Sequence, residues 1–398
     1  MAHIAWLGKK TPFCGNVTYG LTTTHALRSR GHGISFIHFD TPAGSLGRSG
    51  EVLPEVENLG DSNGGGPEVA LPYLVKSQVY TIPSLGAQRE LRESLERLKP
   101  DLVHASLTLS PLDFRLPDLC QQLGLPVVAT FHPAFDASLR NLTAGTQQLT
   151  YQLYAPTLAK FDRVIVFSEL QADVLLRLGV RAERLAVIPN GVDTDTWRPA
   201  PESPSPELQE LRQRFAGRRV FLYMGRVATE KNVEALIKAW RLVRPAGCTL
   251  VIVGDGPLRS ALQATGDEAD LVWWGYEPSL ERRVAFQQLA EVFLLPSLVE
   301  GLSLALLEAM ASGTACIATD AGADGEVLEG GAGIVISTQG VTTQLRTLLP
   351  VLRDQPVLTA ELGRRARLRA LERYTLAGNI NALEALYAEL VPQGSLVA

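Results

Sequence analysis

The sequence predicts an α/β protein with two doubly wound parallel sheets, one in each half of the chain. Its 398 residues exceed what one hydrophobic core usually organises, so two domains are expected. Apolar segments of strand length alternate with helical patterns in both halves, which is the order that produces parallel sheets covered by helices. A proline-rich segment at Trp197–Pro206 separates the two series and has the composition of a linker.

The first half opens with a strand–helix–strand unit. His3–Gly8 is a short apolar strand, Val17–Arg30 has the pattern of a helix that ends at Gly31, and Ile34–Phe39 returns as a strand. Residues 41–73 then lose periodicity and form a long insertion rich in Gly, Pro and Ser. Order resumes with a helix at Leu85–Leu98 and with strands at Gln78–Ile82, Leu102–Ala105, Val127–Phe131, Arg163–Ser168 and Ala186–Pro189.

The second half repeats the alternation and ends in helices between Val341 and Leu390. We expect domains at 1–193 and 216–375, a linker at 194–215 and a C-terminal helix at 376–398 that packs back towards the first domain. Because ligands of such sheets bind beyond the carboxyl ends of the strands, two facing sheets predict a ligand cleft. The expected strands are Val220–Met224, Leu250–Val253, Leu271–Trp274, Val292–Leu295, Ala315–Thr319 and Ile334–Ile336.

Composition and charge exclude several classes of protein. The net charge of −5 and the lack of a polybasic block argue against a nucleic-acid partner. Four scattered cysteines form no metal-binding spacing and fit a reducing compartment. The longest apolar run is interrupted by Pro296 and Glu300, so any membrane contact is expected to be peripheral. We therefore expect a cytoplasmic protein.

The stretch Pro296–Gly313 has the strongest functional pattern. It follows a predicted strand and passes through a turn with Gly301 into a helix, an arrangement that presents backbone N–H groups to an anion. In one continuous helix, Glu300 and Glu308 would lie about 80° apart. The two glutamates can meet one ligand only if Glu300 lies in the loop and Glu308 on the helix, with Ser303 as the N-cap.

Two basic residues follow the first strand of the second half. Arg226 closes the turn after Gly225, and Lys231 starts the next helix. A planar guanidinium and a point charge at one strand end could hold a diphosphate, although Arg and Lys are also common at a solvated helix start.

Glycine turns end the next two strands. Gly254 could admit a nucleotide close to the backbone, with Pro257 at the first helical position, or form a plain tight turn. A nucleotide base could lie against the backbone near Tyr276, although Trp274 beside it is typical of a core residue.

The first half contributes weaker candidates. Gly15 lies at a predicted helix N-terminus, where a phosphate could approach its N–H, and Gly20 could merely relieve packing. His132 ends a strand at the predicted cleft, although a lone histidine is usually a satisfied polar residue. Asp193 and Asp195 spell the DxD pattern of some metal-dependent transferases, but they lie at the linker, and we expect no metal.

In this order and spacing the motifs resemble the retaining glycosyltransferases of family 4, which have the GT-B fold of two Rossmann-like domains. The resemblance covers nearly the whole chain and is most specific in the second half. It rests on the glycine-containing N-terminal loop, His132, Pro189-Asn190-Gly191-Val192-Asp193, Gly225-Arg226 with Lys231, Val253–Pro257 and the pair Glu300 and Glu308.

The resemblance implies a role for each matching residue, and no cofactor beyond a nucleotide-sugar co-substrate. Arg226 and Lys231 would hold the diphosphate, Glu308 the ribose hydroxyls and Glu300 the hydroxyls of the donor sugar. The backbone of Gly301, Leu302 and Ser303 would bind sugar and phosphate, and His132 would lie near the sugar. Gly15 matches one residue of a glycine pair at the phosphate. Asn16 stands where the family has the second glycine, so it could contact substrate instead. Gly254 and Tyr276 would lie at the nucleotide.

Within the family, the segments WLGKKTPFCGNVTYG and FLYMGRVATEKN are similar to cyanobacterial digalactosyldiacylglycerol synthases. This enzyme class moves galactose from UDP-galactose to monogalactosyldiacylglycerol at a membrane surface, here a plasma or thylakoid membrane. The segment Phe135–Tyr154, with Leu139, Leu142, Leu149 and Tyr151 and few charges, is a candidate lipid contact or an ordinary core helix. The alternatives are a transferase for a soluble or polysaccharide-precursor acceptor and a nucleotide-sugar-binding protein without turnover.

Overall fold

The computed structural model describes residues 1–11, 14–40, 66–77, 80–135, 142–266 and 268–391. These residues form two compact units. The first comprises Met1–His132, Thr150–Ile188 and the chain end from Asn379, and the second comprises Pro133–Leu149 and Pro189–Gly378. Residues 41–65 of the expected insertion lie outside the described residues. The domain boundaries given above remain predictions.

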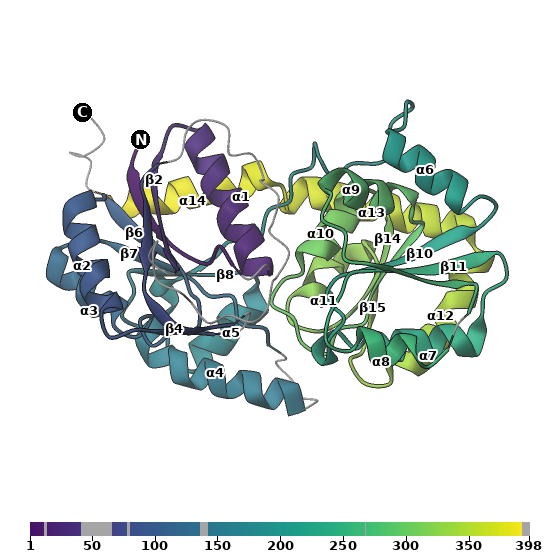
Figure 1. The fold of residues 1–398 in the computed structure, drawn as a ribbon, viewed down its shortest axis with the longest axis horizontal. Coiled ribbons are helices and arrows are strands. Elements are labelled where there is room, and N and C mark those ends of the chain that lie inside the picture. The colour runs from purple at the N-terminus through teal and green to yellow at the C-terminus, as the bar shows by residue number, and fades with distance from the viewer. Residues whose placement is uncertain (12–13, 41–65, 78–79, 136–141, 267, 392–398) are drawn as a thin grey trace. The chain divides into compact units, whose positions relative to one another are not determined.

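The first unit is built on a seven-stranded sheet in which every strand pair is parallel (Figure 1). Its order is β3-β2-β1-β6-β7-β8-β9. The strands are β1 (His3–Leu7), β2 (Gly33–Phe39), β3 (Glu68–Leu71), β6 (Leu102–Ser106), β7 (Val127–Thr130), β8 (Arg163–Val166) and β9 (Leu185–Val187). β6 and β7 are buried throughout, as expected for central strands with helices on both faces.

Helices and one hairpin complete the first unit. The hairpin pairs β4 (Tyr73–Lys76) with β5 (Thr81–Pro83). The helices are α1 (Gly15–Ser29), α2 (Ala87–Leu98), α3 (Leu116–Leu123), α4 (Leu142–Leu158), which begins in the second unit, α5 (Glu169–Arg177) and the 3₁₀ turn Ala182–Arg184. From Asn379 onward α14 (Leu376–Leu390) also belongs here, and the Tyr387 hydroxyl lies 2.5 Å from His104 Nδ1.

The second unit contains a six-stranded parallel sheet in the order β12-β11-β10-β13-β14-β15. The strands are β10 (Arg219–Met224), β11 (Cys248–Val253), β12 (Leu271–Gly275), β13 (Val292–Leu295), β14 (Ala315–Thr319) and β15 (Ile334–Ile336). The strand order reverses between β10 and β13. Ligands of doubly wound sheets bind at the carboxyl ends of such neighbouring strands.

The helices of the second unit are α6 (Pro206–Arg214), α7 (Val233–Val243), α8 (Arg259–Gln263), α9 (Leu280–Leu289), α10 (Leu304–Ala311), α11 (Asp324–Val327), α12 (Val341–Asp354) and α13 (Pro356–Arg373), with 3₁₀ turns at Thr229–Lys231 and Glu329–Gly331. Most of these helices alternate with the strands, whereas α6 precedes the sheet and α12 and α13 follow its last strand. α6 lies inside the expected linker, because Ser205 caps it and Leu208 and Leu211 are buried.

The predicted fold class of two parallel doubly wound sheets is confirmed, and the expected strands form within a few residues of their predicted bounds. The prediction that Pro257 occupies the first helical position is wrong, because α8 begins at Arg259. The Leu258 N–H donates to the Val227 carbonyl at 3.1 Å, so the preceding turn is bonded to the turn that follows β10 and the helix starts later.

Candidate active site

In the second unit, the turns that follow β10 and β13 meet at the reversal of strand order. The Lys231 ammonium lies 2.5 Å from Glu300 Oε1, and the Ser297 hydroxyl donates to the same oxygen at 2.7 Å. Glu300 is only 7 % exposed. Asn232 donates to the Pro296 carbonyl at 3.2 Å, which fixes the two turns to each other. Two residues predicted from different motifs, Lys231 and Glu300, are thus brought into direct contact.

Arg226 lies in the turn that follows β10. The Tyr223 hydroxyl donates to its carbonyl at 2.6 Å, and its guanidinium pairs with Glu230. Both cations of the predicted diphosphate site are therefore paired with glutamates of the protein itself. A diphosphate would compete with these carboxylates for the two cations.

Glu300 and Glu308 lie on different elements, as predicted. Glu300 belongs to the turn before α10, and Ser303 is the N-cap of α10, its hydroxyl accepting from the Leu306 N–H at 3.4 Å. Glu308 lies within α10 and is partly exposed. Burial raises the pKa of Glu308 to about 7, and the charge of Arg283 opposes this rise.

The segment Glu300–Ser303, which we call the donor loop, has an ordered pattern of backbone bonds. The Glu300 carbonyl accepts from the Phe135 N–H and the Gly301 carbonyl from the Ala323 N–H, both at 2.9 Å. The N–H groups of Gly301 and Leu302 have no acceptor within the described part of the chain. These two N–H groups remain available for an anion or a sugar oxygen.

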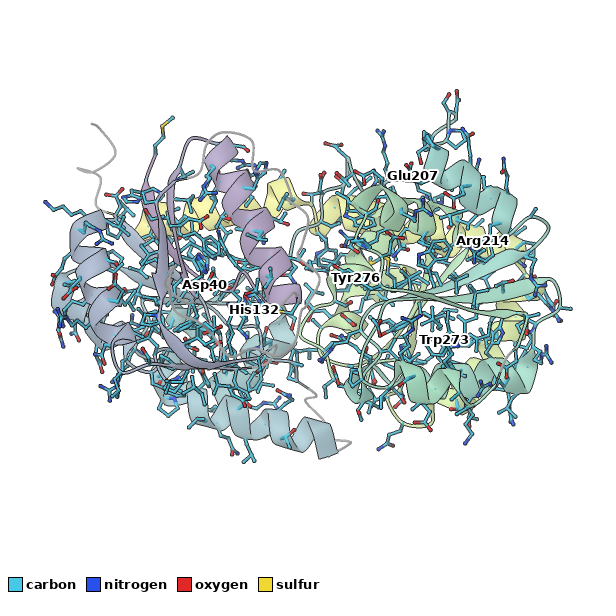
Figure 2. All side chains as sticks on the ribbon, viewed as in Figure 1. Asp40, His132, Glu207, Arg214, Trp273 and Tyr276 are labelled. Atoms are coloured by element: carbon cyan, nitrogen blue, oxygen red, sulfur yellow. The ribbon has the colours of Figure 1, made fainter. Side chains whose placement is uncertain are left out.

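Gly254 and Tyr276 follow neighbouring strands of the same sheet. Gly254 has φ +137°, and a Cβ on it would lie 1.9 Å from the Gly225 carbonyl oxygen, so this position requires glycine. Its N–H donates to the Gly275 carbonyl at 2.7 Å. Tyr276 is 42 % exposed (Figure 2), whereas the Trp274 ring packs against the Arg214 guanidinium at 4.7 Å. Trp274 is half-buried and therefore not a core residue, and Tyr276 beside it is exposed.

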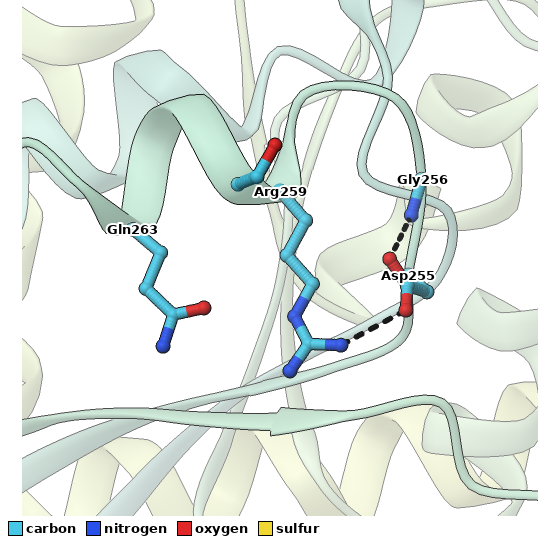
Figure 3. A pocket seen from close by; sticks show the side chains of 5 residues that line it. Asp255, Gly256, Arg259 and Gln263 are labelled. Atoms are coloured by element: carbon cyan, nitrogen blue, oxygen red, sulfur yellow. Dashed lines mark hydrogen bonds and ion pairs between the residues drawn. The ribbon is translucent and has the colours of Figure 1, made fainter.

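A cavity of about 280 Å³ lies beside α8 (Figure 3). Asp255 holds its rim by accepting from Arg259 at 2.9 Å and from the Gly256 N–H at 2.7 Å. Gln263 projects from α8 on the same side as Arg259. None of the predicted site residues lines this cavity.

In the first unit, His132, Ser106 and Asn16 form a hydrogen-bonded chain at the carboxyl ends of the strands (Figure 2 labels His132). Ser106 donates to Asn16 Oδ1 at 2.9 Å and lies 2.8 Å from His132 Nε2. Because the hydroxyl proton goes to Asn16, His132 donates through Nε2 and carries its lone pair on Nδ1. Burial lowers the pKa of His132 to about 3, so the ring is neutral. Asn16 also donates to the Leu107 carbonyl at 3.0 Å. Ser106, which links Asn16 to His132, was not predicted from the sequence.

Gly15 is the first residue of α1, and a Cβ on it would meet no atom within 4 Å. Asp193 accepts from the Asp195 N–H at 3.0 Å and from the Thr196 hydroxyl at 2.6 Å, so it caps a turn. Among the described residues no group of three or more His, Cys, Asp or Glu side chains is placed to hold a metal ion. No described helix is long and apolar enough to cross a membrane.

The candidate lipid-contact segment Phe135–Tyr154 has both buried and exposed apolar side chains, so its role remains a prediction. Among the described side chains of this segment, Phe135, Tyr151 and Tyr154 are buried, whereas Leu149 and Leu153 are 65 % and 63 % exposed. Leu139 lies outside the described residues, and the side chain of Leu142 is not described. Burial follows from packing, since the Tyr151 hydroxyl accepts from Gln171 at 2.9 Å and the Tyr154 hydroxyl donates to Asp113 at 2.9 Å.

Two family models match the chain. "Glycosyltransferase Family 4" matches residues 15–196, and "Glycosyl transferases group 1" matches residues 218–354. The chain belongs to the family 4 glycosyltransferases. It has the GT-B fold, since it superposes on Anabaena HepE, solved in complex with UDP and glucose, with a TM-score of 0.76 and 17 % identity over 98 % of this chain and 100 % of that chain.

Two curated relatives are both 27 % identical to this chain. Alpha-monoglucosyldiacylglycerol synthase of Streptococcus pneumoniae aligns over 61 % of this chain and 59 % of its own length. Sulfoquinovosyl transferase SQD2 of Arabidopsis thaliana aligns over 75 % of this chain and 58 % of its own length. The aligned regions thus span less than two thirds of these relatives.

Proposed function

We propose that this glycosyltransferase moves a hexose from a UDP-sugar to a membrane glycolipid with retention of anomeric configuration. The observation that carries the proposal is the contact between Lys231 and Glu300, beside Arg226 and the open N–H groups of the donor loop. One point of the sheet edge thereby offers cations and N–H donors for a diphosphate and a carboxylate for sugar hydroxyls. The UDP and glucose held by HepE support this class of donor.

The chain's residues act on the leaving diphosphate and on the sugar. When the diphosphate enters, Lys231 and Arg226 exchange glutamate partners for phosphate oxygens, and Glu300 becomes free to accept from sugar hydroxyls. Charge grows on the diphosphate as its bond to the sugar breaks, and fixed cations and N–H groups stabilise that charge. The acceptor hydroxyl attacks the same face of the anomeric carbon, and its proton passes to the departing phosphate oxygen. His132 Nδ1 is proposed to accept from a sugar hydroxyl, and Glu308 to accept both ribose hydroxyls.

A lipid acceptor is supported by the names of the two curated relatives and by the surface of the first unit. The β4–β5 hairpin exposes several large apolar side chains, including Leu74 at 69 % exposure, Tyr80 and Ile82, and Leu85 follows it. We propose this hairpin as the lipid contact. In its most specific form, the proposal names galactose as the sugar and monogalactosyldiacylglycerol as the acceptor.

The test is to incubate the protein with UDP-galactose or UDP-glucose and vesicles that contain monogalactosyldiacylglycerol or diacylglycerol, and to identify products by mass. We expect a hexosylated lipid and free UDP. Arg226→Ala should lower turnover by about 10²–10³, as expected for loss of a charged donor at the leaving group. Lys238→Ala, an exposed lysine of α7, is the control. UDP binding without product would contradict transfer, and product only with soluble acceptors would contradict the lipid assignment.

A further inference from the structure

The peptide group between Leu302 and Ser303 is held from both of its ends. Asn190 donates through Nδ2 to the Leu302 carbonyl at 3.1 Å, and Asp324 Oδ1 accepts from the Ser303 N–H at 3.0 Å. The C=O and N–H of a trans peptide point in opposite directions. The two side chains therefore hold one peptide plane from opposite sides, an arrangement that we call the peptide grip.

Both side chains of the peptide grip are buried and incompletely bonded. Asn190 is 3 % exposed and Asp324 is fully buried. Within the described part of the chain, Asn190 Oδ1 and Asp324 Oδ2 have no hydrogen-bond partner. Buried polar atoms without partners oppose folding. Selection for stability alone would not favour Asn190 and Asp324 at these positions. We therefore infer that they serve to position the peptide group that they bond.

The rest of the donor loop is fixed by backbone bonds. The Phe135 and Ala323 N–H groups hold the carbonyls of Glu300 and Gly301, which leaves the N–H groups of Gly301 and Leu302 on the opposite sides of those peptides. Gly322 approaches so closely that a Cβ on it would lie 2.0 Å from the Glu300 carbonyl oxygen. The peptide at 302–303 is the third in this row, and it is the one held by side chains.

We propose that Asn190 and Asp324 are positioning residues for a nucleoside diphosphate hexose. By fixing the 302–303 peptide, they hold the two open N–H groups and Glu300 in the orientation that the diphosphate and sugar require. Neither residue touches the reacting atoms in this scheme. Such preorganisation lowers the barrier because the donors need not reorient as charge develops. The inference rests on the proposed function and deepens it.

The kinetic test compares four variants. Asp324→Asn keeps an acceptor oxygen for Ser303 and should stay within about threefold of wild-type kcat/KM for the UDP-sugar, whereas Asp324→Ala should lose about 10–100-fold. Asn190→Asp should lose at least as much as Asn190→Ala, because its carboxylate oxygen would face the Leu302 carbonyl. Asn379→Ala, which removes a buried asparagine of α14 in the first unit, is the control for stability loss alone. Activities are compared per folded molecule, with melting measured for each variant.

Amide hydrogen exchange over residues 299–304 separates failure of this inference from failure of the proposed function. Asp324→Ala should speed exchange of the Ser303 amide by at least tenfold, and Asp324→Asn should leave it near the wild-type rate. If the wild-type protein transfers no sugar, the proposed function is overturned, and so is the proposed role of Asn190 and Asp324 in donor binding. If the wild-type protein is active, alanine variants within twofold of its kcat/KM, like the Asn379 control, overturn the inference. So does an unchanged exchange rate in Asp324→Ala.

Discussion

At the scale of a single residue, the proposed contact of Glu308 with the ribose predicts that donor binding depends on pH. Its pKa is raised to about 7 by burial, so it is largely protonated below neutral pH. Only the ionised carboxylate accepts from two ribose hydroxyls at once. UDP affinity should therefore fall as pH decreases below 7, by at most tenfold per unit, and level off above pH 8. Calorimetric titration between pH 5.5 and 8.5 measures this dependence.

The matched variant for this prediction is Glu308→Gln, which keeps the shape of the side chain and removes its titration. It should bind UDP weakly at every pH in the range. 2′-deoxy-UDP should lose less affinity than UDP on this substitution, because it lacks one of the two hydroxyls. A wild-type affinity that stays constant from pH 5.5 to 8.5 contradicts the ribose role of Glu308.

At the residue scale, sequence patterns predicted where single side chains lie better than they predicted which residues those side chains contact. The division of Glu300 and Glu308 between loop and helix follows from Gly301 and Ser303, which are local signals. Asp324 gave no such signal. It approaches Ser303 because β13 and β14 are adjacent strands, and the intervening 20 residues carry no pattern that encodes this contact. Hydrogen bonds between segments distant in sequence depend on packing, which periodicity does not describe.

At the scale of elements, the turns after β10, β11 and β12 are bonded in a row. The Gly225 N–H donates to the Val253 carbonyl at 2.9 Å, and the Gly254 N–H donates to the Gly275 carbonyl at 2.7 Å. A side chain at Gly254 would displace the Gly225 carbonyl and with it the turn that carries Arg226. Gly254 therefore supports the turn that carries Arg226, the residue proposed to bind the diphosphate.

Gly254→Ala should consequently weaken both stability and donor binding. The positive φ and the 1.9 Å approach predict a loss of about 1–3 kcal/mol in the free energy of unfolding. UDP affinity should fall in the fraction that remains folded. Gly15→Ala is the control, since its Cβ meets no atom within 4 Å and should leave thermal stability unchanged. A Gly254→Ala protein with wild-type melting and wild-type UDP affinity would contradict this role of the turn.

Helices and strands could be predicted where composition and periodicity indicate the same structure. They could not be predicted where tertiary contacts determine the structure. The strands of both sheets could be predicted because buried parallel strands are short apolar runs between turns. The residues at 206–214 were assigned to a linker because four prolines lie between residues 199 and 206. However, Ser205 caps a helix here, and Leu208 and Leu211 pack it. The buried sides of Tyr151 and Tyr154 could not be distinguished from a lipid-facing surface, because both kinds of surface use the same side chains.

At the scale of the whole molecule, the end of the chain completes the core of the first unit. His104 is fully buried, contacts Thr130 Oγ1 through Nε2 at 2.7 Å and meets the Tyr387 hydroxyl of α14 through Nδ1. Burial lowers the pKa of His104 to about 3, so the ring stays neutral and each nitrogen needs a partner. Glu384 adds an ion pair with Arg30 at 2.6 Å and a hydrogen bond with His32 Nε2 at 3.1 Å.

Tyr387→Phe should therefore destabilise the first unit by about 1–3 kcal/mol, the cost of a buried polar atom left without a partner. Chemical unfolding of the full-length protein measures this change. Tyr276→Phe, at an exposed tyrosine of the second unit, should change the free energy of unfolding by less than about 0.5 kcal/mol. Equal stability of the two variants would show that the His104 contact does not hold α14 in place.

The proposed lipid contact concerns the whole molecule, because a lipid acceptor lies in a bilayer and the protein must bind the bilayer surface to reach it. Insertion of exposed apolar side chains into a bilayer gains free energy in proportion to the area buried, and a charge at the same position removes this gain. Leu74→Glu combined with Leu85→Glu should therefore lower sedimentation with vesicles at least fivefold. Both side chains are exposed, so folding and UDP affinity should persist. Leu149→Glu on α4, where the side chain is 65 % exposed, should sediment like the wild type. If Leu149→Glu abolishes binding and the hairpin variant does not, the contact lies on α4, and if neither changes it, lipid reaches the protein elsewhere.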